Sequence, residues 1–340
     1  MVGGNGLNLC LILVYFDDHL VAKKTMAAAK GALRVVSDTF KARELGAPAY
    51  FLRLHIEPDE AVKILLLHQR QYTATLLQRF GMAAAHPVRL PMSTGVKLQN
   101  TGVFLTPELE KVYQELFGVL LYLCAGTRPE ISYAVGRLTR HVASPTVGHL
   151  AAAKMVLRYL KSTESLGVRH QADGDLRGHC DTDIGAVADT RRSTKGHMFM
   201  YMGGAIAWDS KVQPTVAAST MEAEFIASAV AAKNAIGLRR LCGFLEGHDT
   251  PVFIRCDSQS VLAMINNPVS STRTKQVDIR HHVICERVAD GTLAVRYLAT
   301  GEQRADALTK PLGTIELLKC VDGMGMDDNA CNKEAPMEEC

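Results

Sequence analysis

The 340-residue sequence predicts an α/β protein whose second half carries a mixed sheet with flanking helices. Two observations predict this class. Short apolar runs alternate with helical periodicity along the chain, and from residue 176 three strand-like runs precede alternating helices and strands. The length allows about two domains at roughly 150 residues each, and the composition, 47% apolar and 21% charged, is that of an ordinary globular chain.

The first ninety residues predict a small α+β unit. An apolar run over 9–15, a turn at Asp17 and Asp18, and a return run over 19–22 are typical of a hairpin with acids at its tip. Further elements are expected as helices over 27–40 and 71–80 and as strands over 49–56 and 62–67. Pro87 and Pro91 mark the end of this unit.

Residues 106–161 are predicted to be mostly helical, starting at Thr106 with Pro107 just inside the helix. Over 149–161 an apolar stripe lies beside a basic one, formed by Lys154, Arg158 and Lys161. Between residues 128 and 169 there are seven basic and two acidic residues. The stripe is interpreted either as a solvated helix face or as a contact for nucleic-acid phosphates, and we expect the phosphate contact.

The remaining elements follow in order. Strands are expected over 176–182, 197–202, 205–208, 252–256 and 293–298, and helices over 220–245, 258–266, 277–288 and from 303. The acid-rich end, 327–340, is predicted to be a disordered tail. The domain boundaries expected from this pattern are 1–90, 91–172, 173–312 and a tail over 313–340.

Composition excludes several classes of protein. A net charge of +3 shows no overall basic excess, and a single Trp argues against a base-stacking module. Nine scattered cysteines without a C-x-x-C pair exclude a disulfide framework and a zinc ribbon, and favour a reducing compartment. The apolar run at 7–16 lacks a basic start and is too short to span a bilayer, so no membrane partner is expected.

Acids near element ends predict a metal site in the second half. Asp181 ends a strand, Glu222 lies in the first turn of a helix, Asp257 follows a strand, and Asp306 starts the last helix. Carboxylates that meet over one sheet edge can hold Mg²⁺. Spacing alone leaves other roles open, namely a capping box for Glu222, an N-cap for Asp257 and a helix-dipole contact for Asp306.

Three stretches of sequence surround these acids, 180–227, 254–288 and 302–312, and they contain the motifs CDTD, STMEAEFIA, IRCDSQS and EQRADALTKPL. These stretches resemble the RNase H domain of copia-type LTR retrotransposon polyproteins. Upstream, YFDDHLVA, ELGAPAYFLRLHI, RQYTATLLQRFGM and the stretch 118–163 resemble the reverse transcriptase palm end, primer-contacting hairpin, thumb and connection. One departure is Arg53, which stands where the family has glycine in its FLG word.

The resemblance implies an RNase H-like fold with four metal-binding acids at Asp181, Glu222, Asp257 and Asp306. Asp183 lies on the same strand face as Asp181, and the family pattern favours Asp181. The implied cofactor is a pair of Mg²⁺ ions, with Mn²⁺ as the alternative, and the implied activity is cleavage of RNA in RNA–DNA hybrids.

In the first unit, Asp17 and Asp18 resemble the paired aspartates of the polymerase palm. The family's third carboxylate is expected well upstream, so polymerisation by this chain alone is not expected. The partners implied are an RNA–DNA hybrid and other retrotransposon polyprotein products, in the cytoplasm or nucleus. The alternative function is that of a catalytically inactive transposon relic that still binds nucleic acid.

Overall fold

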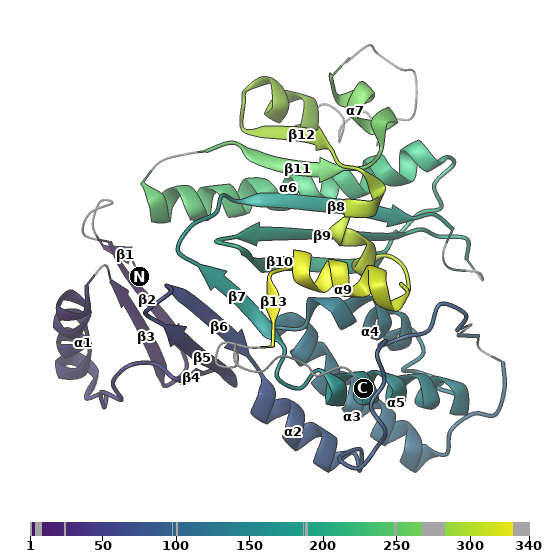
Figure 1. Cartoon of the computed structure of the whole chain (residues 1–340), viewed down its shortest axis with the longest axis horizontal. Coiled ribbons are helices and arrows are strands. Elements are labelled where there is room, and N and C mark those ends of the chain that lie inside the picture. Colours follow the sequence, from purple (N-terminus) through teal and green to yellow (C-terminus); the bar gives the residue numbers. More distant parts are fainter. Residues whose placement is uncertain are drawn as a thin grey trace, which may run out of the picture.

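The computed structural model describes residues 2–3, 9–23, 25–96, 98–99, 101–185, 187, 190–247, 250–266 and 283–328. A small hairpin sheet lies at one end, a group of helices lies below, and a larger sheet backed by a long helix forms the other end (Figure 1). Within the described part of the chain, no helix is both long and apolar enough to cross a membrane.

The N-terminal hairpin has the predicted form. β2 (Cys10–Tyr15) pairs antiparallel with β3 (Asp18–Lys23), and β1 (Val2–Gly3) extends the sheet beside β2. Tyr15 pairs with Asp18, which leaves Asp17 in the turn and puts Asp18 at the start of β3. α1 (Met26–Phe40) follows, and the Thr25 side chain caps its first turn.

A second, antiparallel sheet joins distant parts of the chain in the order β13-β7-β6-β5-β4. Its strands are β4 (Tyr50–Phe51), β5 (Leu54–Asp59), β6 (Ile64–His68), β7 (Gly167–Gln171) and β13 (Met326–Asp327). The strand β7 was not predicted.

The tail prediction for 313–340 is wrong over its described part. α9 (Thr314–Gly323) carries buried Leu317, Cys320 and Val321, and β13 pairs with β7. The acid-rich composition begins only after these apolar residues, at 327. Residues 329–340 lie outside the described residues.

Four helices form the central group. They are α2 (Arg70–Arg79), α3 (Pro107–Gly126), α4 (Ser132–Thr139) and α5 (Val147–Ser162). As predicted, α3 starts at Thr106, whose side chain accepts a hydrogen bond from the Leu109 amide at 3.5 Å. The apolar core of this group continues without a break into α9 and one face of the larger sheet, so the predicted connection region shares its core with the larger sheet.

The larger sheet is five-stranded and mixed, as predicted, in the order β10-β9-β8-β11-β12. Its strands are β8 (Arg177–Asp183), β9 (Thr194–Tyr201), β10 (Gly204–Val212), β11 (Val252–Cys256) and β12 (Leu293–Tyr297). β9 runs antiparallel to both of its neighbours, β8 and β10, and β8, β11 and β12 run parallel.

Helices cover both faces of this sheet (Figure 1). α6 (Thr220–Glu246) packs its alanine-rich face against β8, β9 and β11, and α7 (Gln259–Asn266) packs beside it. Of the helix expected over 277–288, residues 283–288 are helical within an observed helix at 283–289, and 277–282 lie outside the described residues. The 3₁₀ helix η4 (Arg304–Leu308) and α9 lie on the opposite face, where an α-helix from 303 was expected.

Candidate metal-binding and catalytic site

Three of the predicted acids lie close together at one edge of the larger sheet. Asp181 is in the central strand β8, Asp257 directly follows the parallel neighbour β11, and Asp306 is in η4 on the adjoining face. The carboxyl ends of β8 and β11 meet at the same edge because these strands run parallel. This placement is the one that the sequence predicts for these three residues.

Close packing of η4 on the sheet brings Asp306 to this edge. The glycine at 196 in β9 leaves room for the helix: a Cβ there would lie 2.7 Å from Leu308 Cβ and 2.8 Å from Thr309 Cγ2. Thr309 then donates a hydrogen bond from Oγ1 to Oδ2 of Asp181. A larger residue at 196 would push η4, and Asp306 with it, away from β8.

One cation in the chain lies between two of these acids. Nζ of Lys310 is 3.0 Å from Oδ1 of Asp306 and 3.8 Å from Oδ2 of Asp181. Burial lowers the pKa of Lys310, but the carboxylates of Asp181 and Asp306 more than offset this and raise its pKa overall. Lys310 therefore remains charged and neutralises part of the acidic group.

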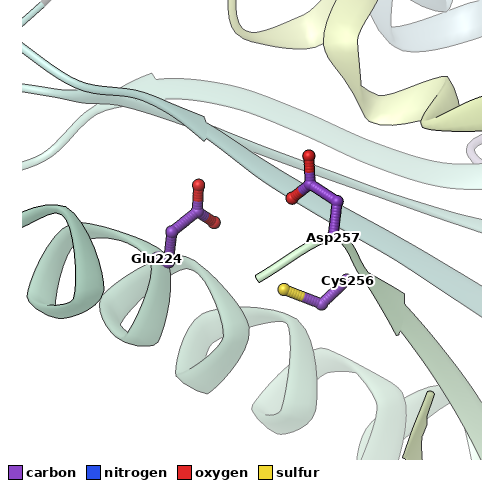
Figure 2. A group of neighbouring side chains, drawn as sticks. All are labelled: Glu224, Cys256 and Asp257. Atoms are coloured by element: carbon purple, nitrogen blue, oxygen red, sulfur yellow. The ribbon is translucent and has the colours of Figure 1, made fainter. Parts of the chain in front are cut away.

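The fourth place is taken by Glu224, so the prediction that Glu222 joins the group is wrong. Glu222 is engaged at the start of α6, in a variant of the capping box that the sequence left open. Its amide donates to Oγ of the N-cap residue Ser219 at 3.2 Å, and its carboxylate accepts the amide of Ala218, the residue before the N-cap, at 2.8 Å. Glu224 follows Glu222 by two residues, which is a rotation of about 200° around the helix axis. Its side chain therefore points to the other side of α6, toward the end of β11 (Figure 2).

A sequence signal for Glu224 exists. Glu224 lies on the same helical stripe as the buried Ser228, Ala231 and Ala235, at spacings of four, three and four. A carboxylate on the buried stripe of a helix needs a cation or a hydrogen-bond donor. Glu222, by contrast, belongs to the S-x-x-E pattern that its capping role explains.

Burial and mutual repulsion raise the pKa values of these acids. Burial first, then the charges of Asp181 and Asp257, raise the pKa of Glu224 to about 9. Burial and then Asp181 raise the pKa of Asp306 to about 7 and also raise that of Asp257.

Asp183, the alternative to Asp181, lies toward the outer side of the group. Its pKa is raised, mainly by burial, and Lys310 and Arg137 lower it. Glu224, Asp257 and Asp306 all sense the charge of Asp181. Asp181, with 2% of its surface exposed, is therefore the centre of the group.

The donor set fits a hard divalent cation. Glu224 is 7% exposed, and its Oε2 is buried without a hydrogen-bond partner among the described residues. Carboxylate oxygens are the protein ligands that Mg²⁺ prefers. Asp181, Glu224, Asp257 and Asp306 could hold such ions between the sheet edge, α6 and η4.

The predicted phosphate stripe on α5 is engaged within the protein, contrary to expectation. Arg158 Nε donates to the carbonyl of His86 at 2.6 Å, and Lys161 Nζ donates to the carbonyl of Ala85 at 2.9 Å. These side chains fasten the segment after α2 onto α5. Lys154, the third predicted residue, is exposed.

A basic groove lies instead between α4 and β10. Its volume is about 540 Å³, and its basic lining comprises Arg137, Arg140, Arg192 and Lys211. Lys211 pairs with Asp209 at 3.1 Å, and Lys211, Arg140 and Arg192 are all exposed. The groove adjoins the acidic group, because Arg137 is close enough to lower the pKa of Asp183.

Asp17 and Asp18 line a separate cavity of about 1220 Å³. The cavity is bounded by the β4–β5 turn and by Tyr122 of α3, whose hydroxyl donates to the carbonyl of Leu52. The acidic group at the larger sheet does not contribute to its lining.

The sheet order and the carboxylates over its central parallel strands define an RNase H-like domain. No protein-family model matches the sequence. The chain is 36% identical over 331 residues to the retrovirus-related Pol polyprotein from transposon TNT 1-94 of Nicotiana tabacum, covering 95% of this chain and 25% of that protein. It is also 36% identical over 320 residues to the corresponding polyprotein from transposon RE2 of Arabidopsis thaliana, covering 91% and 21%.

A putative transposon Ty5-1 protein of Saccharomyces cerevisiae is 31% identical over 221 residues, covering 63% of this chain and 70% of that protein. The chain belongs to the retrovirus-related Pol polyproteins of copia-type transposons. It spans about a quarter of the length of the TNT 1-94 polyprotein.

Two solved structures share parts of the arrangement. RNase H1 from the archaeon Halobacterium salinarum is similar with a TM-score of 0.30 and 19% identity, over 40% of this chain and 95% of that one. The foamy viral protease-reverse transcriptase in complex with double-stranded DNA gives 0.44 and 12%, over 85% and 55%.

Proposed function

We propose that the chain hydrolyses the RNA strand of RNA–DNA hybrids with two divalent cations held by Asp181, Glu224, Asp257 and Asp306. The observation that carries the proposal is the meeting of four carboxylates from β8, α6, η4 and the end of β11, with one buried oxygen of Glu224 that has no hydrogen-bond partner among the described residues. Burying carboxylates so close together costs folding free energy, and clusters of this kind are typical of functional sites.

The ligands form two subsets. Glu224 and Asp257 lie on the α6 side of the site, and Asp181 and Asp306 lie around Lys310. When bound, a pair of cations supplies an activated water and stabilises the departing 3′ oxygen. Asp181 is placed to serve both subsets, and Lys310 keeps Asp181 and Asp306 facing one point.

The hybrid would approach along the basic groove. Arg140 and Arg192 are exposed in that groove, next to the end of β8, and would contact phosphates without sequence preference. The choice of RNA over DNA would come from contacts to 2′-hydroxyls in the shallow groove of the hybrid. This interface replaces the α5 stripe that the sequence predicts.

The test is cleavage of a labelled RNA–DNA hybrid in Mg²⁺ and in EDTA, with double-stranded DNA as the comparison substrate. Asp257→Asn and Glu224→Gln should each lower the cleavage rate by a factor of about 100 or more. Glu222→Gln is the matched control, since it keeps the capping pattern and lies outside the site. Circular dichroism checks that each variant folds.

The alternative, an inactive relic, predicts hybrid binding without cleavage under every condition. Unchanged rates in Asp257→Asn and Glu224→Gln would contradict the assignment of the site. A large loss in Glu222→Gln alone would return the fourth place to Glu222.

A further inference from the structure

We propose that Glu224, Cys256 and Asp257 form a second kind of metal site, one that binds a thiophilic divalent cation such as Zn²⁺. Two of its ligands belong to the proposed Mg²⁺ site, and the third, the Cys256 thiol, is absent from that set. Binding of the thiophilic ion does not depend on the proposed nuclease activity. Only its inhibitory consequence rests on the proposed function.

The three side chains converge on one space between α6 and the end of β11 (Figure 2). The Cys256 sulfur and one carboxylate oxygen from each acid all lie within 4.8 Å of one another. In a tetrahedral zinc site, with Zn–S at about 2.3 Å and Zn–O at about 2.1 Å, neighbouring ligand atoms are about 3.5 Å apart. Rotamer adjustments of about 1 Å would therefore close the set around an ion.

The strand alternation of β11 directs the thiol into this space. Val252, Ile254 and Cys256 share the buried face that packs on α6, whereas Asp257 follows at the strand end. The Ser258 amide donates to the Cys256 sulfur at 3.4 Å, and the Ser228 hydroxyl lies 3.9 Å away. These donors would hold the sulfur in place and support a thiolate when metal binds.

Glu224 supplies the independent sign of a ligand. It is more than nine-tenths buried, its Oε2 accepts no hydrogen bond from the described residues, and Figure 2 shows it facing Cys256 and Asp257. Neither neighbour can satisfy this oxygen fully, because a thiol is a weak hydrogen-bond donor and Asp257 is itself an acid. A cation among the three would satisfy all of them.

The ligand set determines the class of ion. Mg²⁺ uses oxygen ligands, whereas thiolates select softer metals such as Zn²⁺ and Cd²⁺. On binding, the thiol proton leaves to solvent and the metal–sulfur bond forms in its place. With three protein ligands, the fourth position stays open to water. An ion held this way would use Glu224 and Asp257 and so would exclude Mg²⁺ from them.

The experiment is a titration of the metal-free full chain with Cd²⁺, followed by the ultraviolet charge-transfer absorption of cadmium–thiolate bonds. Wild type should show tight binding of one ion through a thiolate. Cys256→Ser should lose that signal. Glu224→Gln, which keeps every cysteine, should weaken the same binding by about tenfold or more because a ligand is lost.

Cys242→Ser is the matched control. Cys242 is also buried and lies on α6, but 18 residues beyond Glu224 and outside the three-residue group, whereas Cys180 contacts the Cys256 thiol directly and is unsuitable. Cys242→Ser should keep the wild-type titration. A signal that survives Cys256→Ser, or that is unchanged in Glu224→Gln, would overturn the proposal, as would loss of the signal in Cys242→Ser alone.

A second readout tests the consequence for the nuclease. Zn²⁺ should inhibit Mg²⁺-dependent hybrid cleavage by wild type and by Cys242→Ser, whereas Cys256→Ser should need at least tenfold more Zn²⁺. If the chain cleaves no hybrid, the proposed function fails, while the Cd²⁺ titration still decides the metal site. Equal Zn²⁺ sensitivity in wild type and Cys256→Ser would contradict the inhibitory consequence.

Discussion

Replacing Glu224 by glutamine should stabilise the metal-free protein, and more so as the pH rises. Burial and the neighbouring acids raise the pKa of Glu224 from 4.5 to about 9. A carboxyl group with a raised pKa binds its proton more tightly in the folded state. The free energy of unfolding therefore falls as the pH rises from about 4.5 to about 9.

The size of the effect follows from the width of that window. Each pH unit above 4.5 costs about 1.4 kcal/mol, so the cost at pH 7 is about 3 kcal/mol and at pH 5 is below about 1 kcal/mol. Glutamine has the shape of the protonated side chain and cannot ionise, so Glu224→Gln avoids this cost. Its amide can donate to the carboxylates of Asp181 and Asp257.

The assay is urea denaturation in EDTA at pH 5, 7 and 8.5. Glu224→Gln should exceed wild type by up to about 3 kcal/mol at pH 7, with a flatter dependence on pH. Glu222→Gln is the control and should stay within about 0.5 kcal/mol of wild type at every pH. Parallel pH profiles for wild type and Glu224→Gln would refute the reasoning.

Two further predictions concern the basic side chains. Arg158→Ala and Lys161→Ala should each destabilise the fold by about 1 kcal/mol in thermal unfolding, because each loses hydrogen bonds to backbone carbonyls, whereas Lys154→Ala should have little effect. Arg140→Ala combined with Arg192→Ala should lower the log–log salt slope of hybrid binding by about two units, measured by fluorescence anisotropy. A loss of slope in the Arg158 and Lys161 variants instead would restore the α5 interface.

Much of the fold could be predicted because periodicity and caps act locally. The β11 bounds agree with expectation, and Thr106 starts α3 as the cap rule predicts. The strand β7 could not be predicted, because its polar sequence gains its place only by pairing with β6 and β13 from distant parts of the chain. Long-range pairing of this kind has no local signal.

The β4–β5 turn shows how tertiary contacts allow a residue that the local rule disfavours. Leu52 and Arg53 both have positive φ, 49° and 56°. Arg53 stands where glycine, which adopts such angles readily, was expected. The Arg53 guanidinium lies over the Tyr72 ring, 5.3 Å from its centre. This cation–π contact offsets part of the conformational cost.

The positions of the acids could be predicted where the end of a strand fixes them. The prediction was wrong where the face of a helix decides which side chain points to the group. Asp257 lies at the sheet edge because it follows the end of β11, whereas the choice of Asp181 over Asp183 needed the family pattern, since both residues lie on one face of β8. Glu222 and Glu224 differ by about 200° around one helix, and matching the family's motif to this sequence assigned the metal role to Glu222, for which the capping pattern was the alternative. For the basic stripe on α5, the spacing correctly predicted that the three side chains share one face of the helix. It carried no information about the segment after α2, which lies against that face and accepts hydrogen bonds from two of them.

The raised pKa values also predict how divalent cations stabilise this protein. A cation that binds only the folded state stabilises it by about 2.7 kcal/mol at a concentration 100 times its dissociation constant. Because the pKa of Glu224 is about 9, a cation that binds at pH 6 must displace the proton of this carboxyl group. At pH 8.5 this displacement costs much less free energy, because the pH is close to the pKa. At a fixed Mg²⁺ concentration, the gain in unfolding free energy should therefore be larger at pH 8.5 than at pH 6. In Glu224→Gln the gain should be smaller, with a weaker pH dependence that reflects the remaining acids, Asp257 and Asp306. Urea denaturation with and without Mg²⁺ measures both gains, and equal gains for wild type at the two pH values would show that Glu224 does not hold the ion.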